Sequence, residues 1–274
     1  MVSVIVCFHE RIPHLLRCLD ALELNCDSFH EVVISDDGSR PETVAAVKAA
    51  LDKYSFPIEY VWRDSKQFEL AAARNQGVRA AKGDYLVIYD CDFLSLPDTI
   101  KTHIALRKKG RFVAGRCKYL SEEETDDLFA QDPLTGEYLD TIYARQSDRE
   151  LKKLNFRYAR RNALTRLGLT NAEKHSIGSH ISIHREDLEK VNGYDENYVG
   201  WGGEDNDLGK RLVAAGVLCI PALVKARLMH MWHPKEMGEK DWSEGRNVEY
   251  YQRKNRPFRC ANGLVNEAEK SGRE

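Results

Sequence analysis

The stretch "DYLVIYDCD", Asp84–Asp92, decides the fold of this chain, because an unbroken apolar run is followed at once by two aspartates. An apolar run of this length is typical of a strand that is buried on both faces of a sheet. Similar runs, "VSVIVCF", "EVVISDD" and "IEYVWR", precede it, and amphipathic helical segments separate them. We therefore predict βαβ units and an α/β fold, with a mostly parallel sheet that helices cover on both faces.

Polar side chains follow three of these runs. In an open parallel sheet, functional residues lie beyond the carboxyl ends of the strands, which meet at one edge. The residues at these positions are His9 and Glu10, Asp36 and Asp37, and Asp90 and Asp92. We expect them to form one rim.

The second half of the chain begins with acidic, turn-rich sequence over 118–150, which predicts surface helices and loops. A strand is predicted at "SIGSHISIHRE", and a further strand at "KARLMHMWH". Between them, a helix is predicted from about Glu204 to Ala215, with Gly216 ending it.

Composition excludes several classes of protein. The 274 residues carry a formal net charge of −2, so no global basic field favours a nucleic-acid partner. No apolar run reaches the roughly 18 residues that span a bilayer, and the first residues lack a signal-peptide pattern, so we expect a cytoplasmic protein. The seven scattered cysteines predict reduced thiols rather than a zinc site or a disulfide framework.

One basic run stands out, "RELKKLNFRYARRNALTRLG", Arg149–Gly168. Such a run is most often a solvated helix face. It can also attract an acidic acceptor or an anionic membrane surface, so association with the inner face of a membrane stays open.

Two pairs of side chains have the spacing of metal ligands. Asp90 and Asp92 leave the end of a buried strand, where two carboxylates without a counter-charge are costly and can converge on a divalent cation. His230 and His233, three residues apart, could bind the same ion with Asp92 as the oxygen ligand. Turn and structural roles are the alternatives, since turns are rich in Asp and isolated histidines are mostly structural.

Two further residues suit a nucleotide. Asp37 ends a strand before a Gly-Ser turn, where its carboxylate can cap the turn or accept a hydrogen bond from a base or sugar hydroxyl. Arg74 lies in "LAAARNQG", where small neighbours allow close approach, so its guanidinium suits phosphate or nucleobase oxygens. An ordinary surface arginine is the alternative.

The segment "VGWGGEDNDLGKRL", Val199–Leu212, places glycines around a tryptophan and then three carboxylates at a helix start. Acidic residues there meet unpaired backbone N–H groups, so capping explains the acidity. Capping does not explain why Trp201 stands between Gly200, Gly202 and Gly203. The tryptophan offers a flat apolar surface, and the glycines leave the backbone around it unconstrained.

Together these pieces resemble the family 2 nucleotide-sugar glycosyltransferases of GT-A fold, which have a Rossmann-like sheet. The resemblance runs from Val2 to about His233 through "VSVIVCFHER", "VISDDGS", "AAARNQG", "YDCD" and "WGGEDND", in the order of that family. "GWGGEDND" is most similar to the β-1,4-galactosyltransferases and bacterial chondroitin-type polymerases, and "CFHER" resembles the "FHNE" of polypeptide GalNAc-transferases. The resemblance implies a nucleotide-sugar half, residues 1–117, and an acceptor-binding and catalytic half, residues 118–274.

The resemblance also implies roles for individual residues at the donor. It places a uracil pocket at Cys7, Phe8, His9 and Glu10. Cys7 stands where threonine is commoner in the family, and Glu10 where asparagine is commoner.

For the remaining donor residues, the resemblance implies that Asp37 accepts from the base and that Arg74 lies near the base or the diphosphate. Asp90 would meet the ribose or the metal. Asp92 would bind Mn²⁺ or Mg²⁺ directly, and His230 and His233 would complete the shell.

At the acceptor, the resemblance implies that Trp201 stacks on a sugar face, that Gly202 and Gly203 let the segment close, and that Glu204 holds the acceptor. Retaining relatives carry "WGGEN", whereas inverting ones carry an aspartate after "WGGE", as this chain does at Asp205. Asp205 would then be the general base, and its place at a helix start is expected to keep it ionised.

The expected function is an inverting, metal-dependent transfer of a sugar from a UDP-sugar to a carbohydrate acceptor, in bacterial-type polysaccharide or glycoconjugate synthesis. The alternatives are a retaining GalNAc-transferase-like enzyme and an inactive nucleotide-sugar-binding module. A nucleotidyltransferase would carry a glycine-rich phosphate loop with a lysine, and "CFHERIPHLL" has neither residue. Donor sugar, linkage and oligomeric state are not set by the sequence.

Overall fold

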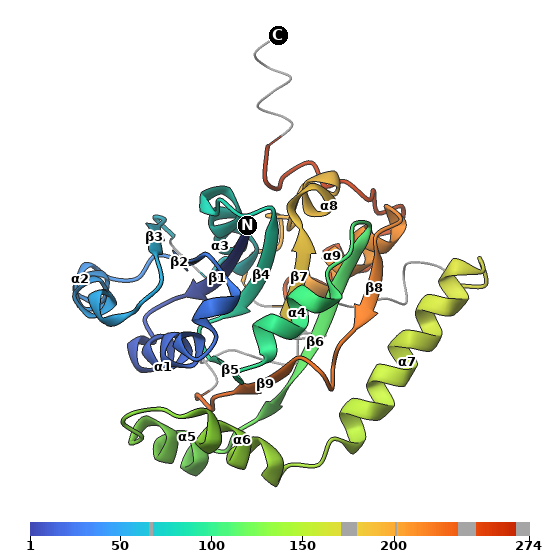
Figure 1. The fold of residues 1–274 in the computed structure, drawn as a ribbon. Helices are drawn as coiled ribbons and strands as arrows, with labels where there is room; N and C mark the ends of the chain where they lie inside the picture. The colour runs from blue at the N-terminus through green and yellow to red at the C-terminus, as the bar shows by residue number, and fades with distance from the viewer. Residues whose placement is uncertain (66–67, 171–179, 201, 235–244, 267–274) are drawn as a thin grey trace.

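The computed structural model describes residues 1–65, 68–170, 180–200, 202–234 and 245–266. Its centre is a nine-stranded sheet in the order β3-β2-β1-β4-β7-β6-β9-β5, with β8 paired to β6 (Figure 1). The strands are β1 (Val2–Phe8), β2 (Glu31–Asp36), β3 (Ile58–Trp62), β4 (Tyr85–Asp90), β5 (Phe93–Ser95), β6 (Arg111–Tyr119), β7 (His180–His184), β8 (Leu218–Pro221) and β9 (Arg227–His230).

Helices flank the sheet on both faces. The α-helices are α1 (Ile12–Glu23), α2 (Pro41–Ala50), α3 (Leu70–Ala80), α4 (Thr99–Leu106), α5 (Glu122–Phe129), α6 (Gly136–Arg145), α7 (Arg149–Arg166), α8 (Arg185–Lys190), α9 (Glu204–Ala214) and α10 (Val248–Tyr251). Two 3₁₀ helices, η1 (Cys26–Ser28) and η2 (Leu51–Lys53), complete the described elements. The predicted α/β fold is confirmed.

The first half of the sheet is parallel, because β1, β2, β3 and β4 pair in one direction. Every residue of β1 is buried, and alternate side chains enter different cores. Val4 and Val6 pack in the core that includes Leu15 and Leu19 of α1. Ile5 packs in the core on the opposite face, with residues of α3, α8 and α9. The unbroken apolar run in the sequence is therefore the signature of a strand covered twice.

The second half makes the sheet mixed. Strand β7 runs antiparallel between β4 and β6, while β9 is parallel to β6 and antiparallel to β5. Strand β6 joins both parts, since its first residues pair with β7 and its last with β9. The boundary that we predicted at residues 117 and 118 lies within β6, and no observation tests that division.

The acidic sequence over 118–150 forms the surface helices α5 and α6, as predicted. Helix α5 begins with a capping box, in which Ser121 and Glu124 each bond the other's backbone N–H. Within the described part of the chain, no helix is both long and apolar enough to cross a membrane.

Candidate active site

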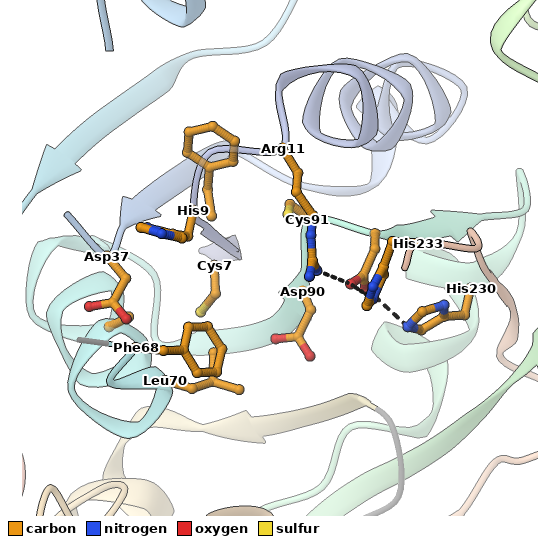
Figure 2. A pocket seen from close by; sticks show the side chains of 13 residues that line it. Cys7, His9, Arg11, Asp37, Phe68, Leu70, Asp90, Cys91, His230 and His233 are labelled. Atoms are coloured by element: carbon orange, nitrogen blue, oxygen red, sulfur yellow. Dashed lines mark ion pairs between the residues drawn. The ribbon is translucent and has the colours of Figure 1, made fainter. Parts of the chain in front are cut away.

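A pocket lies at the carboxyl ends of β1 and β4, where the polar residues were expected to form a rim (Figure 2). Its lining comprises Cys7, Phe8, His9, Arg11, Asp37, Phe68, Leu70, Ala73, Asp90, Cys91, Asp92, His230 and His233. Figure 2 shows Asp37 at one end of the pocket and the two histidines at the other, with Asp90 between them. Side chains far apart in the sequence thus share one elongated site.

Asp92, His230 and His233 form the one group of three ligand-type side chains that the described residues bring within metal-binding distance. Their ligand atoms all lie within 4.8 Å of one another. The Asp92 carboxylate is 3.6 Å from Nε2 of His230 and 3.4 Å from Nε2 of His233. Ligands about 2.1 Å from a shared ion would be roughly 3–3.5 Å apart, so the set fits a metal with little movement.

The charge state of this group also suits a cation. Burial raises the pKa of Asp92, but the hydrogen bond with His233 and the nearby charges of His230 and Arg11 outweigh it, so the pKa lies below its ordinary value. Oδ1 of Asp92 is buried and has no hydrogen-bond partner among the described residues. An ionised carboxylate beside two imidazoles, with one of its oxygens unsatisfied, is suited to bind a metal ion.

Arg74 of α3 holds three carboxylates together. Its Nη1 lies 3.0 Å from Glu204 and 2.8 Å from Asp205, and its Nη2 lies 3.0 Å from Asp90. We call these four residues the Arg74 cluster. The Arg74 side chain is buried over the ring of Tyr194, with the guanidinium 5.1 Å from the ring centre. Arg74 is therefore not the surface arginine of the alternative interpretation.

Asp205 departs from our expectation. A helix start was expected to keep it ionised, but burial, together with the charges of Glu204 and Asp90, outweighs Arg74 and raises its pKa to about 8. The main physical reason is burial, which disfavours the charged carboxylate, and the competition of three carboxylates for one guanidinium adds to it. A carboxyl with a pKa in this range can take and release a proton near neutral pH.

The pocket and the adjoining Arg74 cluster together have an excess of carboxyl groups; Glu204, Asp205 and Arg74 do not line the pocket themselves. Asp90, Asp92, Glu204 and Asp205 bring four carboxyl groups, whereas Arg74 and Arg11 are the guanidinium groups that contact them. Oε2 of Glu204 is buried without a hydrogen-bond partner among the described residues. Burial raises the pKa of Asp90 and of Asp205, and a divalent cation bound next to them would favour their ionised forms.

The residues expected around the uracil base of the donor separate into two groups. Cys7, Phe8 and His9 line the pocket, and burial raises the pKa of the Cys7 thiol. Glu10 does not line it, which corrects the prediction for that residue. Its backbone has a φ of +57°, and its carboxylate turns to Arg40 and Thr43.

Asp37 lines the pocket as predicted, but it already has protein partners. One oxygen accepts from Arg63 at 2.6 Å, and the other accepts from the backbone N–H of Glu69 at 2.6 Å. Each carboxylate oxygen has a second lone pair, so Asp37 can still accept from a ligand. Its contacts also fix the backbone that leads into α3.

The acceptor residues are only partly described. Trp201 lies outside the described residues. Gly202 and Gly203 have φ values of +97° and +96°, which favour glycine, and a Cβ on Gly203 would meet the Tyr198 ring at 2.9 Å. The Gly202 carbonyl accepts from Asn247 at 3.0 Å. These glycines shape the entry to α9, and their contact with an acceptor stays a prediction.

Asp207, the third carboxylate of the same stretch, has a different environment. It accepts from Arg211 at 2.6 Å and from Tyr198 at 3.1 Å, and its Oδ1 lies 3.1 Å from Arg253 and 2.7 Å from Arg256. The neighbouring Asp195 also accepts from Arg253. We call Asp207, Asp195, Arg211, Arg253 and Arg256 the Asp207 cluster. The Asp207 side chain is fully buried, so this cluster holds the protein together rather than facing a ligand.

Several pocket residues were missed in the sequence. Arg11 follows directly after "CFHE" and lies 3.5 Å from Asp92, so its place next to the rim was the available signal. Phe68 and Cys91 line the pocket without a pattern that marks them, and Tyr194 supports Arg74 from a loop. Tertiary packing brings Phe68 and Tyr194 to the site, whereas Cys91 stands between the two aspartates of the rim.

Two family models match the chain. The model described as glycosyl transferase family 2 matches residues 3–191, and the model described as the N-terminal domain of galactosyltransferase matches residues 159–234. The chain is 29% identical to a chondroitin synthase from Escherichia coli over 230 residues, which are 80% of this chain and 33% of that protein. The chain thus spans about a third of the length of that relative.

Solved structures share the fold. The chain is similar to the catalytic domain of Drosophila β1,4-galactosyltransferase 7 in complex with xylobiose, with a TM-score of 0.54, 16% identity, and coverage of 96% of this chain and 82% of that one. It is also similar to GalNAc-T7 with UDP, GalNAc and Mn²⁺, with a TM-score of 0.59, 16% identity, and coverage of 86% and 44%. These likenesses confirm the GT-A fold.

Proposed function

The chain belongs to glycosyl transferase family 2, and from that premise we propose that it is an inverting, metal-dependent enzyme that moves a sugar from a UDP-sugar to a carbohydrate acceptor. The observation that carries the proposal is a pocket whose lining includes a metal-type ligand set and Asp90, which Arg74 links to Asp205, a carboxyl group able to take a proton. The E. coli relative supports an acceptor in polysaccharide synthesis.

The arrangement of the residues along the pocket suits a nucleoside diphosphate. Cys7, His9 and Asp37 lie at the end where a nucleobase would bind. Asp37 can still accept a hydrogen bond from an N–H group of that nucleobase. Asp92 and the histidines lie at the other end, where a diphosphate would need a counter-charge. UDP is proposed because the GalNAc-T7 structure holds UDP.

The proposed metal is Mn²⁺, with Mg²⁺ as the alternative. Imidazole nitrogens suit transition metals, whereas Mg²⁺ prefers oxygen ligands, so two histidines beside one carboxylate favour Mn²⁺. The GalNAc-T7 structure also holds Mn²⁺. When bound, the cation would neutralise charge on the diphosphate as it leaves. Asp92, His230 and His233 would hold it, and Asp90 would contact the ribose or the metal.

Asp205 is the proposed general base. The acceptor hydroxyl oxygen forms a bond to the anomeric carbon while the bond from that carbon to the diphosphate oxygen breaks. The hydroxyl proton passes to the Asp205 carboxylate, and UDP leaves with the electron pair of the broken bond. Arg74 positions Asp205 through its 2.8 Å contact, and its other nitrogen holds Asp90. Arg74 thus acts on the carboxylates rather than on the uracil.

The acceptor would bind beside Asp205. Glu204 is next to Asp205 and has an unsatisfied buried oxygen, which can accept from an acceptor hydroxyl. Gly202 and Gly203 would let the segment before α9 close over the acceptor, and Trp201 is proposed as the stacking residue. The donor sugar is not set by these contacts.

The decisive experiment is a screen of nucleotide-sugars for released nucleotide, with a panel of glycan acceptors, in Mn²⁺ and in chelator. We expect turnover with a UDP-sugar in Mn²⁺ and none in chelator. Asp92→Ala should remove the Mn²⁺-dependent rate and weaken UDP binding, because the diphosphate loses its counter-charge.

The matched control is Asp52→Ala, which removes an exposed carboxylate on η2 that does not line the pocket. It should keep the wild-type rate. Full activity in strong chelator would remove the metal from the proposal, and nucleotide-sugar binding without any release would indicate an inactive binding module.

A further inference from the structure

Helix α7 lies at the outer edge of the molecule, packed along β8 (Figure 1). Two asparagines fix its rotation. Nδ2 of Asn162 donates to the Cys219 carbonyl at 2.7 Å, and Oδ1 of Asn155 accepts from the Leu223 N–H at 3.1 Å. Leu151 is buried on the same side of the helix. The inner face of α7 is therefore held by specific contacts, which sets what the outer face presents.

The outer face carries apolar side chains in a cationic surround. Phe156 is 68% exposed, and Leu167, the C-cap residue of α7 and three turns further along, is 72% exposed. Residues at this spacing share one face of a helix. Basic residues border them, and all are exposed: Arg149, Lys152, Lys153, Arg157, Arg160 and Arg166. We call Phe156, Leu167 and these six residues the α7 outer face.

The positive charge of this face is not compensated locally. Helix α7 contains seven Lys or Arg residues and one Glu, a net charge of +6 in a chain whose net charge is −2. Among the residues that the structure describes, none of the six basic residues of the outer face forms an ion pair with a carboxylate. These cations are therefore available to an anionic partner.

We propose that the α7 outer face binds the surface of an anionic lipid bilayer, with the helix parallel to the membrane plane. Its 18 residues span about 27 Å, with the apolar side chains entering the interface and the cations bound to lipid phosphates. An acidic polysaccharide would use the cations but gain little from Phe156 and Leu167. A second copy of the chain would have to bring two cationic faces together.

The test is sedimentation with lipid vesicles, which needs no transfer activity and is independent of the proposed function. Wild-type protein should bind vesicles containing about a third phosphatidylglycerol and not vesicles of phosphatidylcholine alone. Lys152→Glu with Arg160→Glu should lower the partition coefficient more than about tenfold, since each basic residue near such a surface contributes roughly fivefold. Phe156→Ser with Leu167→Ser should lower it by about three- to tenfold.

Matched controls exclude general effects. Lys101→Glu with Lys108→Glu reverses two exposed charges elsewhere, and Phe258→Ser removes another exposed ring, so both should bind vesicles like the wild type. All four variants should keep the wild-type melting temperature within about 2 °C, because the changed side chains are exposed.

Three results would overturn the proposal. One is the absence of vesicle binding by the wild type. Another is equal binding to both vesicle compositions. The third is binding to a soluble acidic polysaccharide with two further properties. The Phe156→Ser, Leu167→Ser variant binds the polysaccharide as tightly as the wild type does, and added vesicles displace none of it.

Discussion

The Arg74 cluster and the Asp207 cluster both use helix α9, but they have opposite charge balance. In the first, one guanidinium is shared by three carboxylates, and Oε2 of Glu204 is left without a partner among the described residues. In the second, three arginines surround Asp207 and Asp195. Asp205 and Asp207 are two positions apart, yet they face these two environments.

The difference separates a site from a scaffold. In the Asp207 cluster, the other nitrogens of Arg211 donate to the carbonyls of Val191 and Gly193, so the charges are satisfied. The Arg74 cluster reaches the pocket through Asp90 and has three carboxyl groups for one guanidinium. A buried excess of one sign costs stability and is relieved by a ligand of the other sign. Substitutions in the two clusters should therefore affect different properties.

The largest expected effect is on catalysis. Asp205→Asn keeps the size of the side chain but removes the base, so turnover should fall about 10²–10⁴-fold while UDP-sugar affinity stays nearly constant. Asn also caps a helix about as well as Asp, so the free energy of unfolding should change by less than about 1 kcal/mol. Steady-state kinetics and calorimetry measure these quantities. A variant that turns over at the wild-type rate would exclude Asp205 as the base.

The matched change in the other cluster should act on stability. Asp207→Asn leaves buried arginines without their charge partner, so the free energy of unfolding should fall by about 3–5 kcal/mol. Urea unfolding measures this loss. The rate per folded molecule should remain close to wild type. If Asp207→Asn unfolds like the wild type, the cluster does not hold the scaffold as the contacts imply.

The pH dependence sharpens the contrast further. The base acts when deprotonated, and the pKa of Asp205 is raised to about 8. In saturating Mn²⁺, kcat/KM should therefore rise about tenfold per pH unit below that value and level off above it. The residual kcat/KM of Asp205→Asn should not show this rise with pH. A wild-type profile that is flat from pH 5 to pH 8 would mean that the carboxyl does not titrate in this range.

The raised pKa also predicts a change in stability. The pKa of Asp205 is higher in the folded state than in the unfolded state, so the folded protein keeps this proton to higher pH. The stability that the protonated carboxyl contributes is therefore fully present at low pH. It is lost as the pH rises from about 4 toward 8. Urea unfolding should show Asp205→Asn becoming steadily more stable relative to the wild type across that window. A constant difference between the two proteins would contradict the raised pKa.

The smallest expected effects compare Asp37, which lines the pocket, with Glu10, which does not. Asp37→Asn should weaken UDP binding by about 1–3 kcal/mol, the range for losing a hydrogen bond to a charged group. Glu10→Gln should change it by less than about 0.5 kcal/mol, because its carboxylate bonds Arg40 and Thr43 outside the pocket. Calorimetry of both variants measures the difference. A larger loss at Glu10 than at Asp37 would reverse the assignment.

Much of the site could be predicted from the sequence because parallel strands end at one edge of a sheet. That rule alone places His9, Asp37 and Asp90 in one pocket, which the structure confirms. The sequence could not show that Glu10 turns away, because its left-handed backbone and its contact with Arg40 depend on the following loop.

The charge balance of the two clusters was also beyond the sequence. Arg74 meets Glu204 and Asp205 across 130 and 131 positions, and this contact depends on how α3 packs near the start of α9. The register of β5 against β9 pairs Phe93 with His230, which brings that histidine to Asp92. Helix-start chemistry treats Asp205 and Asp207 alike, whereas tertiary packing separates them.

The most direct test of the central claim is the anomeric configuration of the first product, read by proton NMR before it can equilibrate. The claim is that the acceptor oxygen attacks the anomeric carbon in one displacement while Asp205 takes its proton. This predicts that the new linkage has the configuration opposite to that of the donor sugar. A product that retains the donor's configuration would contradict a single displacement and the role proposed for Asp205.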